Sequence, residues 1–353
     1  MIKSNIQRRI KNNIPFVAYR FPSDKKFFLA DLVDVRPFCF SFLDNPPAKN
    51  GFVVFPFDSE ETEGWWYRQN EIVQFNLQTF KNFSVEKFET EQVTTTSNFD
   101  EYKEQFDIIQ NELLSGKVKK VVLSRIINTS FEVNKHLANF FLQMCTDNPN
   151  AFVYLLVTSE AGIWAGASPE LLINKESNNF TLVSLAGTKR STEMNIENWT
   201  LKELEEQGIV SDFIDNQLKH FNIDNYTKDG PNIVRANSVS HLKTVYRFNT
   251  NVLEGNLGKL VRSLHPTPAI SGEPKDIAMD IIRQTERHKR KFYGGFLGTV
   301  SDNDVKLYVN IRCINFEHEV ENIYVGGGLT TSSNVNEEWR ETEMKSHTVL
   351  RLF

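Results

Sequence analysis

The sequence predicts an α+β fold, in which large antiparallel sheets pack together and helices lie on the outside. Apolar segments that read as hairpin-like strand pairs outnumber strand–helix–strand units, which favours antiparallel over parallel pairing. The chain has 353 residues, 40% of them hydrophobic and 24% charged, so it can bury a substantial core. It contains no internal repeat and no low-complexity tract.

The first hundred residues predict strands and turns. Short apolar segments, FFLADLV, FCFSFL and FVVFPF, are separated by Pro, Asn and Asp. The polar segment VEKFETEQVTTTSNFD follows. We interpret it as a surface loop or hinge, with a poorly formed edge strand as the alternative.

A helix is predicted from Asp100 to Gly116, because Tyr102, Phe106, Ile109 and Leu113 recur at helical spacing. This helix leads directly into KVVLSR, an apolar strand pattern at 120–125. Adjacent strands are expected at AFVYLLV and GIWAGAS. Further helices are predicted at 135–146, 198–219, 274–291 and 335–350, and further strands at 241–254, 295–301, 304–316 and 321–326.

Composition excludes several classes of function. The net charge is −5 and no basic stripe interleaves with aromatic residues, so no nucleic-acid partner is expected. The three cysteines, Cys39, Cys145 and Cys313, predict neither a disulfide framework nor a thiolate metal site. The N-terminus lacks the apolar core of a signal peptide and no apolar run reaches membrane-spanning length, so we expect a soluble cytoplasmic protein.

Two charged residues stand beside apolar strand patterns. Lys120 directly precedes Val121, and Glu170 precedes the strand-like LLI. Burial favours the neutral form of an amine, which suits a general base, and raises the pKa of a carboxyl, which suits a general acid. A structural ion pair explains the same pattern, and composition does not separate the two interpretations.

Two predicted helices carry carboxylates at a spacing of three residues. Glu203 and Glu206 form one pair, and Glu338 and Glu341, followed by Lys345, form the other. Each pair alone is more often a solvated helix face with local ion pairs. If the two faces meet across a cleft, they would form an oxygen site for Mg²⁺.

Three loops contain residues that either line a pocket or connect strands. GGGLTTSS begins at Gly326, and its backbone N–H groups would suit a carboxylate or phosphate, although it matches neither a P-loop nor GxGxxG. LAGTKR contains Gly187 and Thr188, and LHPTPAISGEP contains His265. A lone histidine of this kind is more often structural than catalytic.

Taken in order, nine segments resemble the chorismate-utilising enzymes, and among them the isochorismate synthases most closely. The segments are KVVLSR, SPELLI, LAGTKRS, KELEEQ, LHPTPAISGEP, RKFYGG, NIRCINF, GGGLTTSS and EEWRETEMKS. The resemblance implies a chorismate-binding catalytic domain at 100–353, with residues 1–99 as a divergent N-terminal portion integrated into the same fold. Family members that aminate chorismate typically carry Gln in place of Lys120, and this chain also has Ala186, rather than a nucleophilic Lys, before Gly187.

The resemblance implies a role for each matching residue. Lys120 is the expected general base, which activates water for attack at C2 of chorismate, and Glu170 the expected acid, which protonates the departing C4 hydroxyl. Glu206 and Glu341 are expected to bind Mg²⁺, supported by Glu203 and Glu338. The remaining substrate-binding residues are Gly187, Thr188, His265, Tyr293, Arg312, Gly326, Gly327, Gly328 and Lys345, of which Tyr293 and Arg312 anchor the enolpyruvyl carboxylate.

The implied activity is an Mg²⁺-dependent isochorismate synthase, an isomerase whose product feeds menaquinone or catechol siderophores. The alternatives are a salicylate synthase, which also eliminates pyruvate, and a non-catalytic chorismate-binding protein. We expect a monomer without an amidotransferase subunit. Two positions depart from the family pattern, because Gln207 stands where the family usually has His and the glycine motif is GGG rather than GAG.

Overall fold

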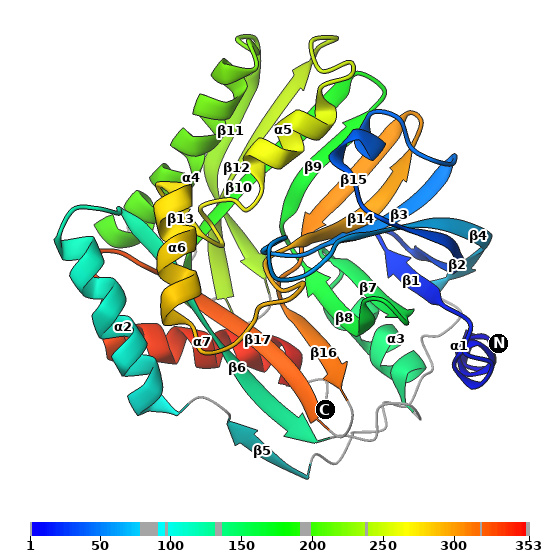
Figure 1. The fold of residues 1–353 in the computed structure, drawn as a ribbon, viewed down its shortest axis with the longest axis horizontal. Helices are drawn as coiled ribbons and strands as arrows, with labels where there is room; N and C mark the ends of the chain where they lie inside the picture. The colour runs from blue at the N-terminus through cyan, green and yellow to red at the C-terminus, as the bar shows by residue number, and fades with distance from the viewer. Residues whose placement is uncertain are drawn as a thin grey trace.

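The fold is a single antiparallel sheet with helices on its outside (Figure 1). The structure is a computed structural model, and it describes residues 2–77, 91–95, 98–130, 136–190, 199–236, 239–317 and 320–350. Seventeen strands belong to the sheet in this part of the chain, and every strand pair is antiparallel. The predicted antiparallel α+β class is confirmed.

The strands form one continuous ladder. In spatial order they are β6 (Lys120–Ser130), β17 (Val320–Leu329), β16 (Cys313–Glu317), β8 (Gly162–Ser168), β7 (Phe152–Thr158), β1 (Phe16–Arg20), β2 (Lys26–Pro37), β4 (Trp65–Asn76), β3 (Asn50–Phe55), β14 (Phe296–Ser301), β15 (Asp304–Val309), β9 (Leu171–Glu176), β10 (Asn179–Arg190), β12 (Val239–Asn249) and β11 (Thr227–Ala236). Two short strands, β5 (Glu91–Thr95) and β13 (Gly272–Glu273), pair with the outer side of β6.

The first four strands lie in the middle of this ladder, although they come first in the sequence. They connect β7 on one side with β14 on the other. The loop after the short 3-10 helix η1 (Phe40–Leu43) adds a further link, since Asp44 accepts hydrogen bonds from the backbone N–H groups of Leu257 (2.8 Å) and Gly258 (3.0 Å). These groups begin helix α5 (Leu257–Leu264), where a carboxylate satisfies otherwise unpaired N–H donors.

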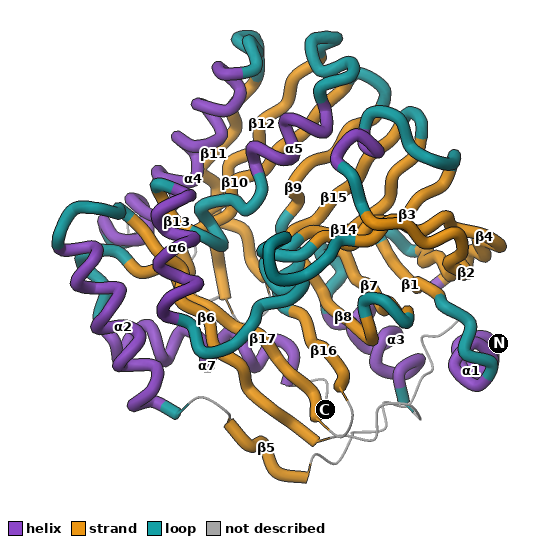
Figure 2. The backbone as a smooth tube through the Cα atoms, in the orientation of Figure 1, coloured by secondary structure: helices purple, strands orange, loops and turns teal. Residues whose placement is uncertain are grey.

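The helices cover the sheet in separate groups (Figure 2). They are α1 (Ile2–Lys11), α2 (Phe99–Leu114), α3 (Leu137–Asp147), α4 (Leu201–His220), α5 (Leu257–Leu264), α6 (Lys275–Thr285) and α7 (Val335–Leu350). α2, α6 and α7 pack near β6 and β17, α4 packs on β10, and α1 lies against α3. Within the described residues, no helix combines the length and apolarity needed to span a bilayer.

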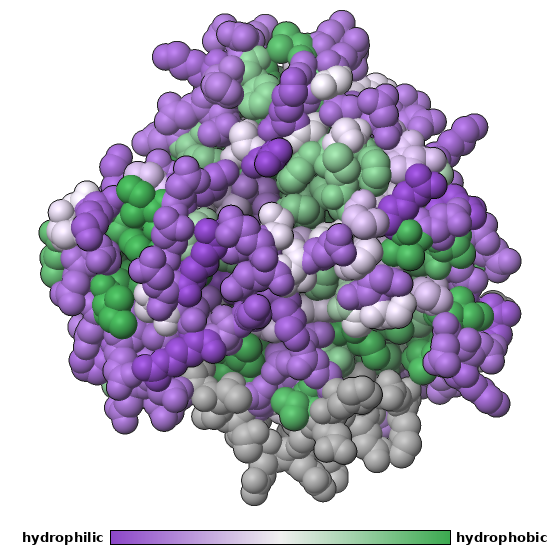
Figure 3. All heavy atoms as spheres, in the orientation of Figure 1, coloured by the Kyte–Doolittle hydropathy of each residue, from purple (hydrophilic) through white to green (hydrophobic). Residues whose placement is uncertain are grey.

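The core consists of three clusters of buried apolar side chains, and many of the aromatic residues of the sequence lie in them. The tryptophans Trp66 and Trp164, for example, are each 1% exposed. Figure 3 shows that the outer surface in that view is mainly hydrophilic with scattered apolar side chains, as is usual for a folded protein in water.

Three predicted elements were too long, and a fourth prediction falls partly outside the described residues. The strand expected at 241–254 ends at Asn249, because the chain then turns, with the backbone N–H of Glu254 donating to Asn251 O (3.0 Å). The strand expected at 304–316 is two strands, because the chain turns at Arg312 (φ 53°), where Tyr154 donates to Asn310 Oδ1 (2.7 Å). The helix expected at 274–291 ends at Thr285, because Glu286 is extended (ψ 134°) and turns inward. In the polar segment expected as a loop, residues 91–95 form β5 at the edge of the sheet, as the alternative interpretation held, and residues 85–90 and 96–97 lie outside the described residues.

Candidate active site

One cavity brings together residues from both ends of the ladder. The empty volume of the cavity, including the solvent space at its open mouth, is about 680 Å³. The lining comes from Val122, Glu170, Leu185, Ala186, Gly187, Glu206, His241, Ala269, Ile270, Tyr293, Ile311, Arg312, Tyr324, Val325, Gly326, Gly328 and Lys345. Most of the predicted site residues therefore lie on or beside a single concave surface, a usual setting for a small-molecule site.

Lys120 lies at the start of β6 and pairs with Glu206, which lines this cavity. Its side chain is fully buried, and its Nζ lies 2.9 Å from Glu206 Oε1 on α4. Burial opposes ionisation of Glu206, but the ion pair with Lys120 and the charges of Lys345 and Lys202 together outweigh it, so that the pKa of this carboxyl falls below its usual value. The ion pair therefore joins the first strand of the ladder to a helix that packs on its far end.

Glu170 follows β8 and lines the cavity with only 3% of its surface exposed. Burial raises the pKa of its carboxyl from 4.5 to about 8, although the positive charges of Lys120, Lys345 and Arg312 act in the opposite direction. Glu170 is therefore mostly protonated at neutral pH and can donate a proton.

Three carboxylates near the cavity each have a lysine partner. Lys120 pairs with Glu206, Lys345 Nζ lies 2.7 Å from Glu341 Oε1, and Lys202 is ion-paired with Glu338. Lys202 was not singled out from the sequence, because its position beside Glu203 resembles a local helix pair. Three carboxylates from α4 and α7 are thus each paired with one lysine.

The charge of Lys202 does not fully stabilise the ionised carboxylate of its partner Glu338. Glu338 is 1% exposed, and its Oε2 has no hydrogen-bond partner within the part of the chain that the structure describes. Burial and the neighbouring charge of Glu341 raise the pKa of Glu338 to about 7, against the effect of Lys202. Nevertheless, no group of three His, Cys, Asp or Glu side chains in the described ranges is gathered for a metal ion. Mg²⁺ typically takes only one or two carboxylates and keeps several waters. A pair of carboxylates such as Glu206 and Glu341 therefore fits this metal.

The three glycines of β17 allow these acids to approach the strand. A Cβ at Gly328 would lie 2.5 Å from Glu206 Oε1 and 2.7 Å from Lys120 Cε. A Cβ at Gly327 would lie 3.1 Å from Glu338 Oε2, and one at Gly326 would lie 2.8 Å from the Tyr293 hydroxyl. The GGG motif therefore makes room for side chains of the site, rather than forming only a tight turn.

Arg312 and Tyr293 supply a cationic and a hydroxyl group to the cavity wall. Arg312 lies in the turn between β15 and β16, and Tyr293 stacks on Tyr324 at a ring-centroid distance of 5.3 Å. Lys345 Nζ also donates to Gly326 O (2.8 Å), which fixes a second positive group at the same wall. An anionic substrate would meet these groups.

Three predicted residues make other contacts or are only partly described. The Glu203 carboxylate accepts from the Thr200 backbone N–H (2.9 Å) and so closes the capping box of α4. The structure does not bring His265 to the cavity, because its Nε2 hydrogen-bonds Pro56 O (2.9 Å) and its ring packs against Phe296. The backbone of Thr188 pairs with His241, and its side chain lies outside the described residues.

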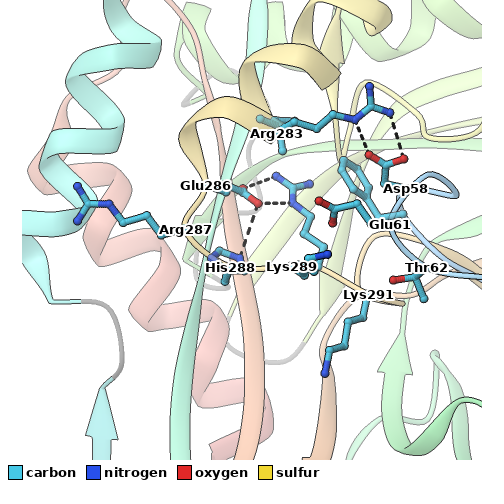
Figure 4. A pocket seen from close by; sticks show the side chains of 12 residues that line it. Asp58, Glu61, Thr62, Arg283, Glu286, Arg287, His288, Lys289 and Lys291 are labelled. Carbon is cyan, nitrogen blue, oxygen red and sulfur yellow. Dashed lines mark hydrogen bonds and ion pairs between the residues drawn. The ribbon is translucent and has the colours of Figure 1, made fainter.

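A second hollow contains none of the predicted site residues (Figure 4). Its charges are largely paired with one another, as Arg283 Nε binds Asp58 Oδ2 (2.5 Å) and Arg290 Nη2 binds Glu286 Oε1 (2.5 Å). Glu286 also accepts from the backbone N–H of Ser124 on β6 (2.7 Å). Side chains that line this hollow therefore anchor β6, the strand that carries Lys120.

Comparison with known proteins decides the family. The family described as "Chorismate binding enzyme" matches residues 57–353. The chain belongs to this family. Among curated relatives, it is 29% identical over 246 residues to the isochorismate synthase EntC of Escherichia coli K12, covering 67% of this chain. It is 27% identical over 252 residues to the isochorismate synthase MenF of Haemophilus influenzae, covering 69% of this chain.

The matched segments span only part of these relatives, 63% of EntC and 58% of MenF. Solved structures extend the likeness in fold to the whole chain. A protein described as the isochorismate synthase DhbC of Bacillus anthracis superposes with a TM-score of 0.82 at 20% identity, covering 100% of this chain and 99% of that one. The menaquinone-specific isochorismate synthase MenF of Escherichia coli gives 0.77 at 19% identity, covering 96% and 88%.

Proposed function

We propose that this family member is an isochorismate synthase, which converts chorismate to isochorismate in the cavity described above. The observation that carries the proposal is that Glu170, a carboxyl protonated at neutral pH, lies on the wall of the same cavity as Glu206, the ion-pair partner of Lys120. A hydroxyl exchange on a ring requires an acid and a base within reach of one bound substrate.

In the proposed reaction, Arg312 and Tyr293 bind the enolpyruvyl carboxylate and so fix the ring. Lys120 accepts a proton from a water molecule while the oxygen of that water bonds to C2 of chorismate. The two ring double bonds each shift by one position, the C4–O bond breaks, and Glu170 donates its proton to the departing hydroxyl. One water is consumed and one is released, and the overall reaction involves no oxidation or reduction. Because Lys120 is ion-paired with Glu206, this pair must open before Lys120 acts as a base.

Mg²⁺ would be held by a pair of acids from α4 and α7, Glu206 and Glu341, with Glu338 supporting them. Once bound there, it would neutralise these carboxylates and attract the ring carboxylate of chorismate. Within the described residues Glu338 Oε2 has no hydrogen-bond partner, and this oxygen and the space left by Gly327 support this assignment. Glu203 is a supporting residue in this proposal through its cap on α4, which orients the helix that carries Glu206.

The direct test is incubation of the purified protein with chorismate, first with Mg²⁺ and then with EDTA, and separation of the products by chromatography. Metal-dependent isochorismate without salicylate is expected. Salicylate together with pyruvate would instead assign the protein as a salicylate synthase, and unconverted chorismate would contradict the proposal. Folded Lys120→Ala and Glu170→Gln variants should both lose turnover, and near-normal turnover in either would overturn its assigned role.

Binding of the metal has a test that does not depend on turnover. Titration with Mg²⁺ alone, followed by calorimetry, should give a dissociation constant that weakens at least tenfold in Glu338→Gln, since a buried carboxylate that supports the metal ligands is lost. The exposed Glu337→Gln on the same helix is the matched control.

A further inference from the structure

His241 on β12 lies in the wall of the cavity and joins two of its loops. It is 7% exposed, and its ring contacts Gly187 on β10 and Arg312 before β16. No sequence feature singles out His241, because a single histidine in SHL resembles an ordinary strand residue.

The two hydrogen bonds determine the state of the ring. His241 Nδ1 lies 3.0 Å from the carbonyl oxygen of Gly187, which can only accept, so Nδ1 carries the proton. Nε2 lies 2.6 Å from Nη2 of Arg312, which can only donate, so Nε2 is the acceptor. Only the neutral imidazole with its proton on Nδ1 satisfies both contacts. Burial, together with the charges of Arg312 and Lys345, lowers the pKa of His241 well below its usual value, which favours that neutral form.

Both partners have backbone conformations that need support. Gly187 is the extra residue of a β-bulge between Ala186 and Thr188, with φ 70°, and this turns its carbonyl toward the ring. Arg312 has φ 53°, a left-handed conformation that is uncommon for a residue with a side chain. Such a residue persists where its surroundings hold it, and one side-chain contact that holds it is the bond to His241.

We propose that His241 is a positioning residue for chorismate, because it accepts a hydrogen bond from Arg312 and thereby aims the guanidinium at the substrate carboxylate. The inference rests on the proposed function for the identity of the substrate. His241 itself neither takes nor gives a proton in the reaction. Its effect should therefore fall on substrate affinity more than on the chemical step.

Two amide variants separate the two hydrogen bonds. In His241→Gln the amide reaches about as far as Nε2 and keeps an acceptor for Arg312, whereas in His241→Asn it reaches about as far as Nδ1 and keeps only the donor to Gly187. A hydrogen bond to a charged group typically corresponds to about 10- to 100-fold in affinity. We expect His241→Asn to raise KM by about tenfold or more with a smaller change in kcat, and His241→Gln to raise it clearly less.

A double variant tests the route through Arg312. If His241 acts by aiming this side chain, His241→Asn should add little to the loss already caused by Arg312→Ala. Equal KM effects of the Asn and Gln variants, a full Asn effect in the Arg312→Ala background, or a large loss of kcat in both variants would each overturn the inference while the proposed function stands.

Crystal structures of the variants without substrate test the inference even if the wild-type protein fails to convert chorismate. The guanidinium of Arg312 should keep its wild-type position in His241→Gln and move in His241→Asn. An unmoved guanidinium in His241→Asn would overturn the inference. Absence of chorismate turnover by the wild-type protein would overturn the proposed function separately.

Discussion

Substitution of Glu170 by Gln should abolish a pH-dependent loss of stability. Because the folded protein raises the pKa of this carboxyl from 4.5 to about 8, folding favours its protonated form. The stabilisation from that proton is complete below about pH 4.5, falls as the pH rises, and is lost above about pH 8. Glutamine has a similar shape and no charge, so the variant should not show this loss.

The size of the effect follows from the shift in pKa. One pKa unit corresponds to about 1.4 kcal/mol, so the full shift is worth on the order of 5 kcal/mol and the part between pH 6 and pH 9 about 3 kcal/mol. Urea denaturation of both proteins at pH 6 and pH 9 measures it. The free energy of unfolding of the wild type should fall relative to Glu170→Gln by about that amount. Glu338 also titrates in this range, but it is present in both proteins and cancels in the difference.

Glu337→Gln is the matched control, because this exposed side chain lies outside the cavity. Its stability should follow that of the wild type at both pH values. If Glu170→Gln and the wild type lose the same stability between pH 6 and pH 9, Glu170 is not a protonated buried acid and the reasoning is refuted.

Three further outcomes are expected. The wild-type kcat/KM should decline above about pH 8, approaching tenfold per pH unit, as Glu170 of the free enzyme loses its proton, and a flat profile up to pH 9.5 would argue against its role as the acid. Lys120→Ala should lower kcat by at least about a hundredfold in a folded protein, measured as the rate of chorismate consumption. Gly328→Ala should strongly reduce turnover because its methyl group would lie 2.5 Å from Glu206 Oε1, whereas Gly208→Ala, with no atom within 4 Å of the new Cβ, should leave turnover unchanged. Equal activities of the two glycine variants would show that the space beside Gly328 is not needed.

The antiparallel fold could be predicted because strand and helix periods are local properties of the sequence. The break in the strand expected at 304–316 could not, since it depends on Arg312 and on a bond from the distant Tyr154. The early end of α6 likewise depends on Glu286, whose carboxylate binds Ser124 on β6. In both places a contact with a remote strand overrides an uninterrupted local pattern.

The candidate site shows the same division. Lys120 and Glu170 were recognisable because a charge directly beside an apolar strand is unusual, and the structure buries both. Lys202 on α4 and Glu338 on α7 are 136 residues apart in the sequence, and no local spacing pattern predicts that they pair. His241 was missed for a similar reason, because its two partners come from two other segments of the chain.

The central claim is that water adds to C2 of chorismate while the C4 hydroxyl departs, and isotope labelling tests it most directly. The protein would be incubated with chorismate and Mg²⁺ in H₂¹⁸O, and the isochorismate analysed by mass spectrometry. The account predicts one ¹⁸O atom per isochorismate, located in the C2 hydroxyl. Unlabelled isochorismate would contradict it by showing that the hydroxyl moves within the substrate, and the absence of isochorismate would contradict the assignment of the activity itself.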